Sequence, residues 1–385
     1  VTALASSNIT VRTDGGGSQD GDIRVSSAIS SSSSNDLTLD ADNDIIINAS
    51  VSRTGSGGLV LTTGSGSVSG SGTISLGGGS SISSSSGATV ENNISLANGD
   101  ATFNQSGTAT YSGIISGSGN FIKAGLGTIT VRGANTYTGD TTLNAGTLTV
   151  SGTLSDSTDV IVNSGTTYDV NTNDTIQSLT GAGTIDIASA RTLTAGGDNG
   201  NESITGNFTG AGNFTKQGSG TYTLLGGSNS TSGLFTSSEG ELVFKGTFSG
   251  SPHLRNNSTF TLDNDITFAS VEGSGAFSIP DTLTLTTGDN GNNAITGTLS
   301  GNGTLVKQGN GTLTLSGTNS SFTGAININV GTIAVSASDN LGATPGSAET
   351  DIVLNGGALR ATAAFTLGTN TVSYTHLTLP TIAGV

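Results

Sequence analysis

Residues Gly117–Gly152 read GSGNFIKAGLGTITVRGANTYTGDTTLNAGTLTVSG, and this stretch decides the fold. Two runs in it, Thr128–Val131 (TITV) and Thr147–Val150 (TLTV), alternate hydroxyl and apolar residues. A period of two is typical of a strand that buries one face. Gly or Asn stands beside each run, and these residues tolerate the left-handed backbone of tight turns. The stretch therefore predicts short strands that are separated by tight turns.

The same motif occurs three times, as a long internal repeat. Its copies share a lysine between glycines and occupy Gly117–Gly139, Gly210–Asn229 and Gly301–Gly324. The shared residues Lys123, Lys216 and Lys307 are 93 and 91 positions apart. Since one turn of a β-solenoid takes roughly 20–25 residues, we expect about four turns, or rungs, in each repeat.

Short strands of this kind build either stacked sandwiches or one solenoid. Sandwich hairpins require Asn-Gly or Asp-Gly turns between alternating runs, and few are present, such as Asn98-Gly99 and Asn355-Gly356. Rungs of similar length, with Thr, Ser and Asn stacked in hydrogen-bonded ladders, favour the solenoid. No stretch has the apolar spacing of a long helix. We predict an all-β, right-handed parallel β-helix with no separate globular domain and no helix of consequence.

Composition excludes several classes of protein. The chain has 385 residues, with 61 Gly, 4 Pro, no Cys and 32% hydrophobic residues, against roughly 45–50% in a typical globular chain. Disorder is the alternative, but disordered chains favour Pro, Lys and Glu, which are scarce here. A net charge of −16 makes nucleic acid and anionic lipid unlikely partners.

The ends of the chain suggest a fragment of a longer protein. It begins with Val1, and its opening residues lack the basic start and apolar run of a signal peptide. Processing of a precursor is the competing explanation. The sequence contains no run of about 18 apolar residues, so it predicts no membrane-spanning helix.

The repeat resembles a known family. Gly117–Gly152 is similar to the autotransporter-associated β-strand repeat of bacterial passenger domains, and Gly301–Ser336 matches as well. The middle copy has TSGLFTSSEGELVF in place of the usual sequence, so we expect a distorted rung there. Asn35–Val68 is similar to repeats of filamentous-haemagglutinin-like secreted proteins. The resemblance implies export through the outer membrane by a translocation barrel or partner transporter, and display at the cell surface or outside the cell.

These likenesses divide the chain into three predicted regions. Residues 1–115 form a β-helix of the filamentous-haemagglutinin type, and residues 116–371 a β-helix with three repeats. Residues 372–385 form a non-native tail that does not extend the solenoid, since Pro380 has no N–H for a central strand. The serine runs Ser31–Ser34 and Ser80–Ser86 are predicted to be polar loops or a hydroxyl-lined face, with linkers as the alternative.

Carboxylates supply two candidate sites. Asp40, Asp42 and Asp44 alternate, and a glycosidase pair needs two carboxyls about 5–10 Å apart with one buried. Nothing nearby supplies burial, so we interpret them as a solvated turn. Asp198–Glu202 and Asp289–Asn293 are oxygen-rich, but neither has a calcium-binding motif. We predict no catalytic, cofactor-binding or metal-binding residues, and no cofactor.

The lysines and histidines also form no predicted binding or metal site. Lys123, Lys216 and Lys307 lie too far apart for a binding stripe, so we predict that they cap turns or keep strand edges soluble. His253 and His376 have no ligand partner at metal spacing. The Asn-X-Ser/Thr triplets, such as Asn207–Thr209 and Asn213–Thr215, follow from composition.

Repetition without a chemically distinctive patch predicts a stalk or adhesin segment that is not an enzyme, with host or matrix glycans or proteins as possible partners. The alternative is a β-helical polysaccharide lyase or glycosidase. Ice binding has less support, because the threonines lack a TxT register on every rung.

Overall fold

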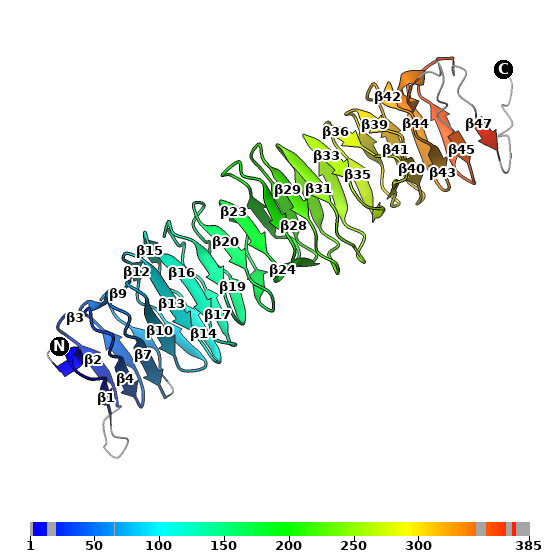
Figure 1. Ribbon diagram of the computed structural model, residues 1–385. Helices are drawn as coiled ribbons and strands as arrows, with labels where there is room; N and C mark the ends of the chain where they lie inside the picture. The colour runs from blue at the N-terminus through cyan, green and yellow to red at the C-terminus, as the bar shows by residue number, and fades with distance from the viewer. Residues whose placement is uncertain (1–2, 14–20, 65, 344–351, 367–371, 375–385) are drawn as a thin grey trace. The chain divides into compact units, whose positions relative to one another are not determined.

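The computed structural model describes residues 3–13, 21–64, 66–343, 352–366 and 372–374, and these residues form short parallel strands (Figure 1). The helical elements in the described ranges are two 3-10 segments, η1 (Ala3–Ala5) and η2 (Ser338–Leu341), so the prediction of no substantial helix is confirmed. Neither segment has the length to cross a membrane. The chain divides into two units: Val1–Asp198 with Ile204–Gly212, and Asn199–Ser203 with Asn213–Val385.

Unit 1 is a parallel β-solenoid whose strands fall into long ladders. The first ladder contains β1 (Ile9–Arg12), β4 (Leu37–Ala41), β7 (Leu59–Thr63), β10 (Ser80–Ser84), β13 (Asp100–Asn104), β16 (Asn120–Ala124), β18 (Thr141–Leu143), β20 (Asp159–Val162), β23 (Ser178–Gly181) and Ile204 of β26 (Glu202–Ile204). The second contains β2 (Ile23–Val25), β5 (Ile45–Ile47), β8 (Val68–Ser69), β11 (Ala88–Val90), β14 (Thr108–Tyr111), β17 (Thr128–Val131), β19 (Thr147–Val150), β21 (Thr167–Val170), β24 (Thr184–Ile187) and β27 (Asn207–Gly210). The third face has β3 (Ile29–Ser31), β6 (Val51–Arg53), β9 (Ile74–Leu76), β12 (Ile94–Leu96), β15 (Ile115–Gly117), and further on β22 (Asp174–Thr175) and β25 (Thr192–Ala195).

Around the first repeat, the register of these ladders agrees with the short end of the predicted rung length. Phe121 pairs with Thr141, and Thr141 pairs with Val160 in the following rung. Alternate residues of each strand are buried, as in the iBiB pattern of β17 and β19. Inward apolar side chains thus stack on buried neighbours one rung away, as Leu148 does on Ile129.

Unit 2 repeats this architecture. One ladder contains β29 (Thr221–Leu224), β31 (Glu241–Phe244), β33 (Thr259–Leu262), β36 (Ala276–Ser278), β39 (Leu299–Gly301) and β42 (Ser321–Phe322). A second face has β28 (Asn213–Lys216), β30 (Leu234–Ser237), β32 (His253–Asn256), β35 (Ser270–Glu272), then β38 (Asn293–Ile295), β41 (Thr312–Leu315), β44 (Thr332–Val335) and β46 (Ala358–Ala361). The third has β34 (Ile266–Phe268), β37 (Thr284–Thr287), β40 (Thr304–Lys307), β43 (Ile326–Ile328), β45 (Ile352–Leu354) and β47 (Val372–Tyr374).

The middle repeat and the tail differ from the sequence predictions. The middle repeat is regular, since Phe214 of β28 pairs with Phe235 of β30, so the expected distortion is wrong. Val372–Tyr374 pairs with β45 as β47, so the prediction that the tail adds nothing to the solenoid is wrong for these three residues. Residues 375–385, with Pro380, lie outside the described residues, and the non-native origin of the tail stays a prediction. Ser80–Ser84 is strand β10, not a linker.

The length of the sequence repeat is not a whole number of rungs. Lys216 lies on β28 and Lys307 on β40, and these strands belong to different sheets of unit 2. From Thr215, four steps of one rung each lead through Thr236, Arg255 and Glu272 to Ala294, and a fifth leads to Thr314. One repeat therefore covers between four and five rungs, somewhat more than the expected value of about four. Equivalent residues of successive repeats consequently emerge on different faces.

The repeated lysines are buried turn anchors. Lys123, Lys216 and Lys307 are at most 2% exposed. Lys123 Nζ donates to the carbonyl oxygens of Ala124 (2.9 Å), Gly125 (2.7 Å) and Ala145 (2.9 Å). An ammonium has three donors, so this turn satisfies all of them. Turn capping is therefore confirmed, whereas the alternative role at soluble strand edges is wrong because these side chains are inside.

A buried asparagine is the second anchor of the repeat. Asn135 Oδ1 accepts from Ile115 N (2.9 Å), and its Nδ2 donates to the carbonyl oxygens of Gly133 (3.1 Å) and Thr153 (2.7 Å). It follows Lys123 by 12 positions, and Asn319 follows Lys307 by the same number. Asn319 Oδ1 likewise accepts from Leu299 N (2.8 Å). The asparagines hold corner backbone that the ladders leave unpaired.

Replacing an anchor lysine tests this arrangement. Lys123→Met retains most of the side-chain volume but leaves three carbonyl groups without their charged donor. We expect the free energy of unfolding to fall by about 3 kcal/mol in denaturant titrations. The matched control is Lys245→Met, because the exposed ion pair of Lys245 with Asp263 (2.8 Å) contributes at most about 1 kcal/mol. Equal losses in the two variants would contradict the anchor role.

Glycines allow the backbone of one rung to approach the next. Gly181 has φ +118°, and an added Cβ would lie 2.1 Å from the carbonyl oxygen of Val162. Gly165 has φ +80°, but an added Cβ would meet no atom within 4 Å. Both positions disfavour other residues, yet only Gly181 is required for rung stacking.

The pair Gly165→Ala and Gly181→Ala separates these two requirements. Gly165→Ala is expected to cost about 1 kcal/mol, from left-handed backbone strain alone. Gly181→Ala adds a clash with backbone, so we expect a loss at least twice as large. Thermal unfolding of both variants is the measurement, and similar melting temperatures would show that the stacking does not require glycine.

Candidate functional site

Polar and charged side chains gather on the outer face of two neighbouring strands of unit 2. In β32, Leu254 and Asn256 are buried, so His253, Arg255 and the following Asn257 point outward. The parallel register with β35 places Ser270 beside His253 and Glu272 beside Arg255. Continuing the same register places Ser274 beside Asn257. We call these six residues the polar grid.

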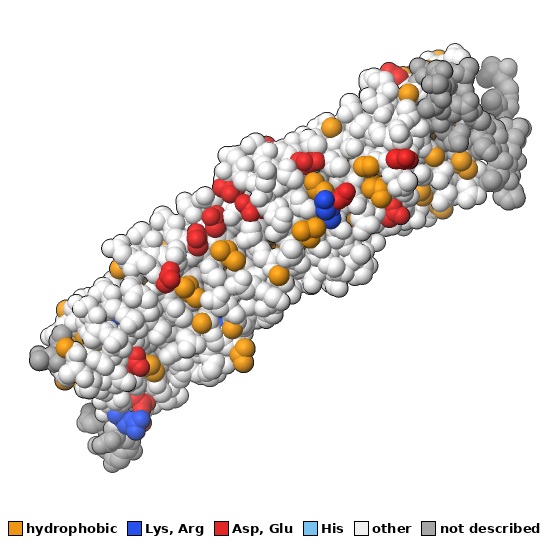
Figure 2. Space-filling model, viewed as in Figure 1, with side chains coloured by type: hydrophobic (Ala, Val, Ile, Leu, Met, Phe, Trp, Pro, Cys, Tyr) orange, Lys and Arg blue, Asp and Glu red, His pale blue; other side chains and the backbone are white. Residues whose placement is uncertain are grey.

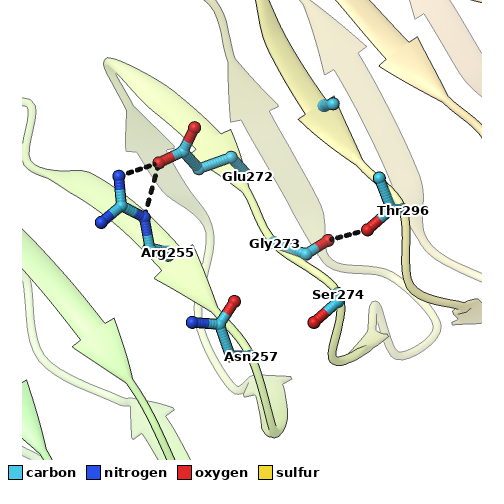
Figure 3. Close-up of a pocket in the computed structure, with 7 residues that line it drawn as sticks. Arg255, Asn257, Glu272, Gly273, Ser274 and Thr296 are labelled. Atoms are coloured by element: carbon cyan, nitrogen blue, oxygen red, sulfur yellow. Dashed lines mark hydrogen bonds and ion pairs between the residues drawn. The ribbon is translucent and has the colours of Figure 1, made fainter.

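The centre of the polar grid is an ion pair (Figure 3). Nη2 and Nε of Arg255 both donate to Oε1 of Glu272, at 2.6 and 2.7 Å. The two side chains are 48% and 30% exposed. Because both contacts use one carboxylate oxygen, Oε2 of Glu272 and Nη1 of Arg255 are left for another partner. At one end, His253 Nδ1 lies 2.6 Å from Ser270 Oγ.

The other end of the polar grid opens into a shallow depression. It has a volume of about 330 Å³ and is lined by Arg255, Asn257, Glu272, Gly273, Ser274, Ala294 and Thr296. One rung beyond Glu272 the column continues with Ala294, and the smaller side chain leaves this space. The exposed side chains of Asn257 and Ser274 have no hydrogen-bond partner among the described residues, and Thr296 Oγ1 donates to Gly273 O (3.3 Å). The arrangement offers donors and acceptors to a polar ligand.

The polar grid lies outside the three repeat motifs, between the second and third copies. The sequence signal was the alternation of His253, Arg255 and Asn257. Its partner strand lies one turn later in the chain, and only the rung length of that region brings it alongside. The face seen in Figure 2 is mostly uncharged, with scattered acidic and hydrophobic side chains and few basic ones.

Hydroxyl residues stack in register on neighbouring rungs, as expected, while hydrogen bonding along these stacks stays a prediction. In unit 1, Thr-X-Thr recurs on three consecutive rungs, β14, β17 and β19, in the same register. The next rung has Asp169 in the second position, and Thr149 Oγ1 donates to its Oδ2 (2.9 Å). The Thr-X-Thr array is interrupted there.

The acidic triplet does not converge on a groove. Asp40 forms an ion pair with Arg12 of the neighbouring strand (2.6 Å). Asp44 Oδ1 accepts from Ser67 N (2.8 Å) in the turn of the next rung, and Asp42 is exposed. Two of the three carboxylates thus serve local backbone and side-chain contacts.

The oxygen-rich loops also use their oxygens internally. Asn201 Oδ1 accepts from Thr221 N (2.8 Å), and Asn292 Oδ1 from Thr312 N (3.0 Å), each one rung away. Asp289 Oδ1 accepts from Gly291 N (2.7 Å) within its own loop. In the part of the chain that the structure describes, no three His, Asp or Glu side chains are grouped to hold a metal ion. His376 lies outside the described residues.

A buried carboxylate in unit 1 was not foreseen. Asp174 is 5% exposed, and its two oxygens accept from Leu154 N (3.2 Å each), while Oδ1 also accepts from Thr175 N (3.1 Å). Burial raises the pKa of Asp174 to about 7. The buried rings of Tyr168 and Tyr137 lie in the same region of the core. This carboxyl anchors the backbone that follows β19.

The raised pKa predicts a specific pH dependence. Between about pH 4 and pH 7 the folded state holds a proton on Asp174 that the unfolded state releases, so its contribution to stability falls as pH rises through that window. Asp174→Asn removes this titration. We expect the difference in melting temperature between the variant and the parent to change between pH 4.5 and pH 8, in favour of the variant at pH 8. A constant difference would contradict the buried titration.

Comparison with known proteins matches the repeats. Three segments, residues 121–150, 214–244 and 305–335, match the passenger-associated-transport-repeat. The chain is 33% identical over 236 residues to the "Adhesin BmaC autotransporter" of Brucella suis biovar 1 (strain 1330). This alignment covers 54% of the chain but only 7% of that relative's length. No solved structure matches the chain. The repeats and the relative together confirm the predicted resemblance to autotransporter passengers. The likeness of Asn35–Val68 to filamentous-haemagglutinin-like repeats stays a prediction.

Proposed function

We propose that this chain, a repeat-bearing segment of an autotransporter passenger, acts at the bacterial cell surface as a stalk with adhesive side chains. The observation that carries the proposal is the coincidence of a parallel β-solenoid with three passenger-associated repeats. In a solenoid each rung contacts only its neighbours, so length can be added without a new core. Such a scaffold extends away from the cell and presents its outward side chains on regular faces.

The chemistry of the scaffold suits display outside the cell. It has no cysteine, and its turns are held by buried Lys and Asn side chains. A net charge of −16 opposes self-association of repetitive strands. An autotransporter passenger implies a translocation domain on the C-terminal side of the same precursor. Host glycans or proteins are the partners that we propose for the adhesive side chains.

The enzyme alternative has a defined requirement. A β-helical lyase or glycosidase needs carboxylates and a basic residue converging on bound polysaccharide. Glu272 has Arg255 beside it, but no second carboxylate lines that depression. A reducing-sugar assay over a panel of polysaccharides separates the two functions, because turnover of any of them would refute a stalk without catalysis.

Surface display gives the direct test of the proposal. The chain is placed between an export signal and a translocation domain in a non-adherent bacterium, and the control strain carries the same elements without the chain. We expect added protease to release the chain from intact cells and attachment to matrix-coated surfaces to rise several-fold. A chain that stays protected from protease, or that is displayed without any gain in attachment, would refute the adhesive function.

A further inference from the structure

We propose that the polar grid is a binding site for a neutral saccharide, which would give the proposed adhesive function a defined contact surface and rests on that function. The observation is a juxtaposition of groups: Arg255 and Glu272 paired at the centre, and the unpaired side chains of Asn257 and Ser274 at the rim of a depression of about 330 Å³. The depression is shallow and open, so a ligand would contact it with one face.

The charges of the polar grid select a neutral ligand. Arg255 and Glu272 cancel each other, and both are in hydrogen-bond contact through Oε1 of Glu272. An anionic ligand that approaches Arg255 meets the carboxylate of Glu272 within the same depression. A cationic ligand that approaches Glu272 meets the guanidinium. A neutral ligand avoids both repulsions.

The hydrogen-bonding groups select hydroxyls. Arg255 Nη1 and the Asn257 amide N–H groups donate, whereas Glu272 Oε2 and the Asn257 amide oxygen accept. The Ser274 hydroxyl does both. A sugar hydroxyl is also donor and acceptor, so neighbouring hydroxyls of one ring can bond to Arg255 and Glu272 together. A ligand with acceptors only would leave the free oxygens of the site unsatisfied.

Strand addition by a peptide is a poor alternative here. That mode requires an unpaired strand edge. Strand β32 pairs with β30 on one side and with β35 on the other, and Gly273 is bridged to Ile295 in the next rung. The backbone at the polar grid is therefore already occupied, and side chains must provide recognition.

The proposal is tested with the purified chain and neutral oligosaccharides of glucose, mannose and N-acetylglucosamine, with a sialylated trisaccharide as the acidic probe. Saturation-transfer NMR identifies the ligand and titration measures its affinity. We expect millimolar or tighter binding of at least one neutral probe. Asn257→Ala should weaken it at least fivefold without a change in melting temperature, because its side chain bonds to no described residue. Thr236→Ala, two rungs before Glu272 on the same outward column, is the matched control and should change nothing.

A variant with altered charge tests the preference for neutral over acidic probes, which a folding defect would not reverse. Glu272→Gln frees Arg255 from its carboxylate, so affinity for the sialylated probe should rise while affinity for the neutral probe falls. Absence of binding by every neutral probe, preference of the parent chain for the acidic probe, or equal effects of Asn257→Ala and Thr236→Ala would overturn the proposal. If displayed cells still attach when Asn257→Ala has abolished saccharide binding, the polar grid binds the saccharide but does not supply the attachment, so its link to adhesion fails and the adhesive function stands. If the saccharide binds but displayed cells do not attach, the adhesive function fails instead.

Discussion

The parallel hydrogen-bond ladder between rungs is the constraint on which the rest of the structure depends. Each strand must present its N–H and C=O groups to the strand one turn later, about 4.8 Å away. Residues of adjacent rungs therefore lie directly above one another, as Thr128, Thr147 and Thr167 do in unit 1. Most inward positions are apolar, and hydroxyl residues occupy many of the outward positions. The low hydrophobic content of the chain follows from this thin core.

At the corners between strands, the ladder does not supply a hydrogen-bond partner for every backbone group. Some carbonyl groups at the turns point into the core, where apolar side chains cannot donate hydrogen bonds to them. A buried polar group without a hydrogen bond is costly. The buried lysines and asparagines solve this problem, since Lys123 Nζ and Asn135 Nδ2 donate to backbone carbonyls at different corners. Burial lowers the pKa of Lys123 to about 8, so the charged donor is retained at neutral pH. These polar anchors explain why the lysine recurs in every copy of the repeat.

The difference between the repeat length and a whole number of rungs determines which residues share an outer face. Because the repeat is not a whole number of rungs, Lys216 and Lys307 anchor corners on different sheets. Residues that stack outward on one face consequently come from non-equivalent positions of the repeat. The polar grid depends instead on the local rung length, because Arg255 and Glu272 are 17 residues apart and meet across one turn, between the second and third copies of the motif. A repetitive scaffold can thus carry side-chain clusters that lie outside its repeat motif.

The sequence by itself determined the fold class, the short strands and the turn positions, because period-two alternation and glycine spacing are local properties of the chain. It also indicated the passenger resemblance, through motifs such as that at Gly117–Gly152. Tertiary structure decided the number of rungs in a repeat, the burial of Lys123, the environment of Asp174 and the pairing of Arg255 with Glu272. Each depends on which residue lies one turn away. Rung length varies along the chain, so that neighbour is set by the accumulated register of the solenoid and not by any local pattern.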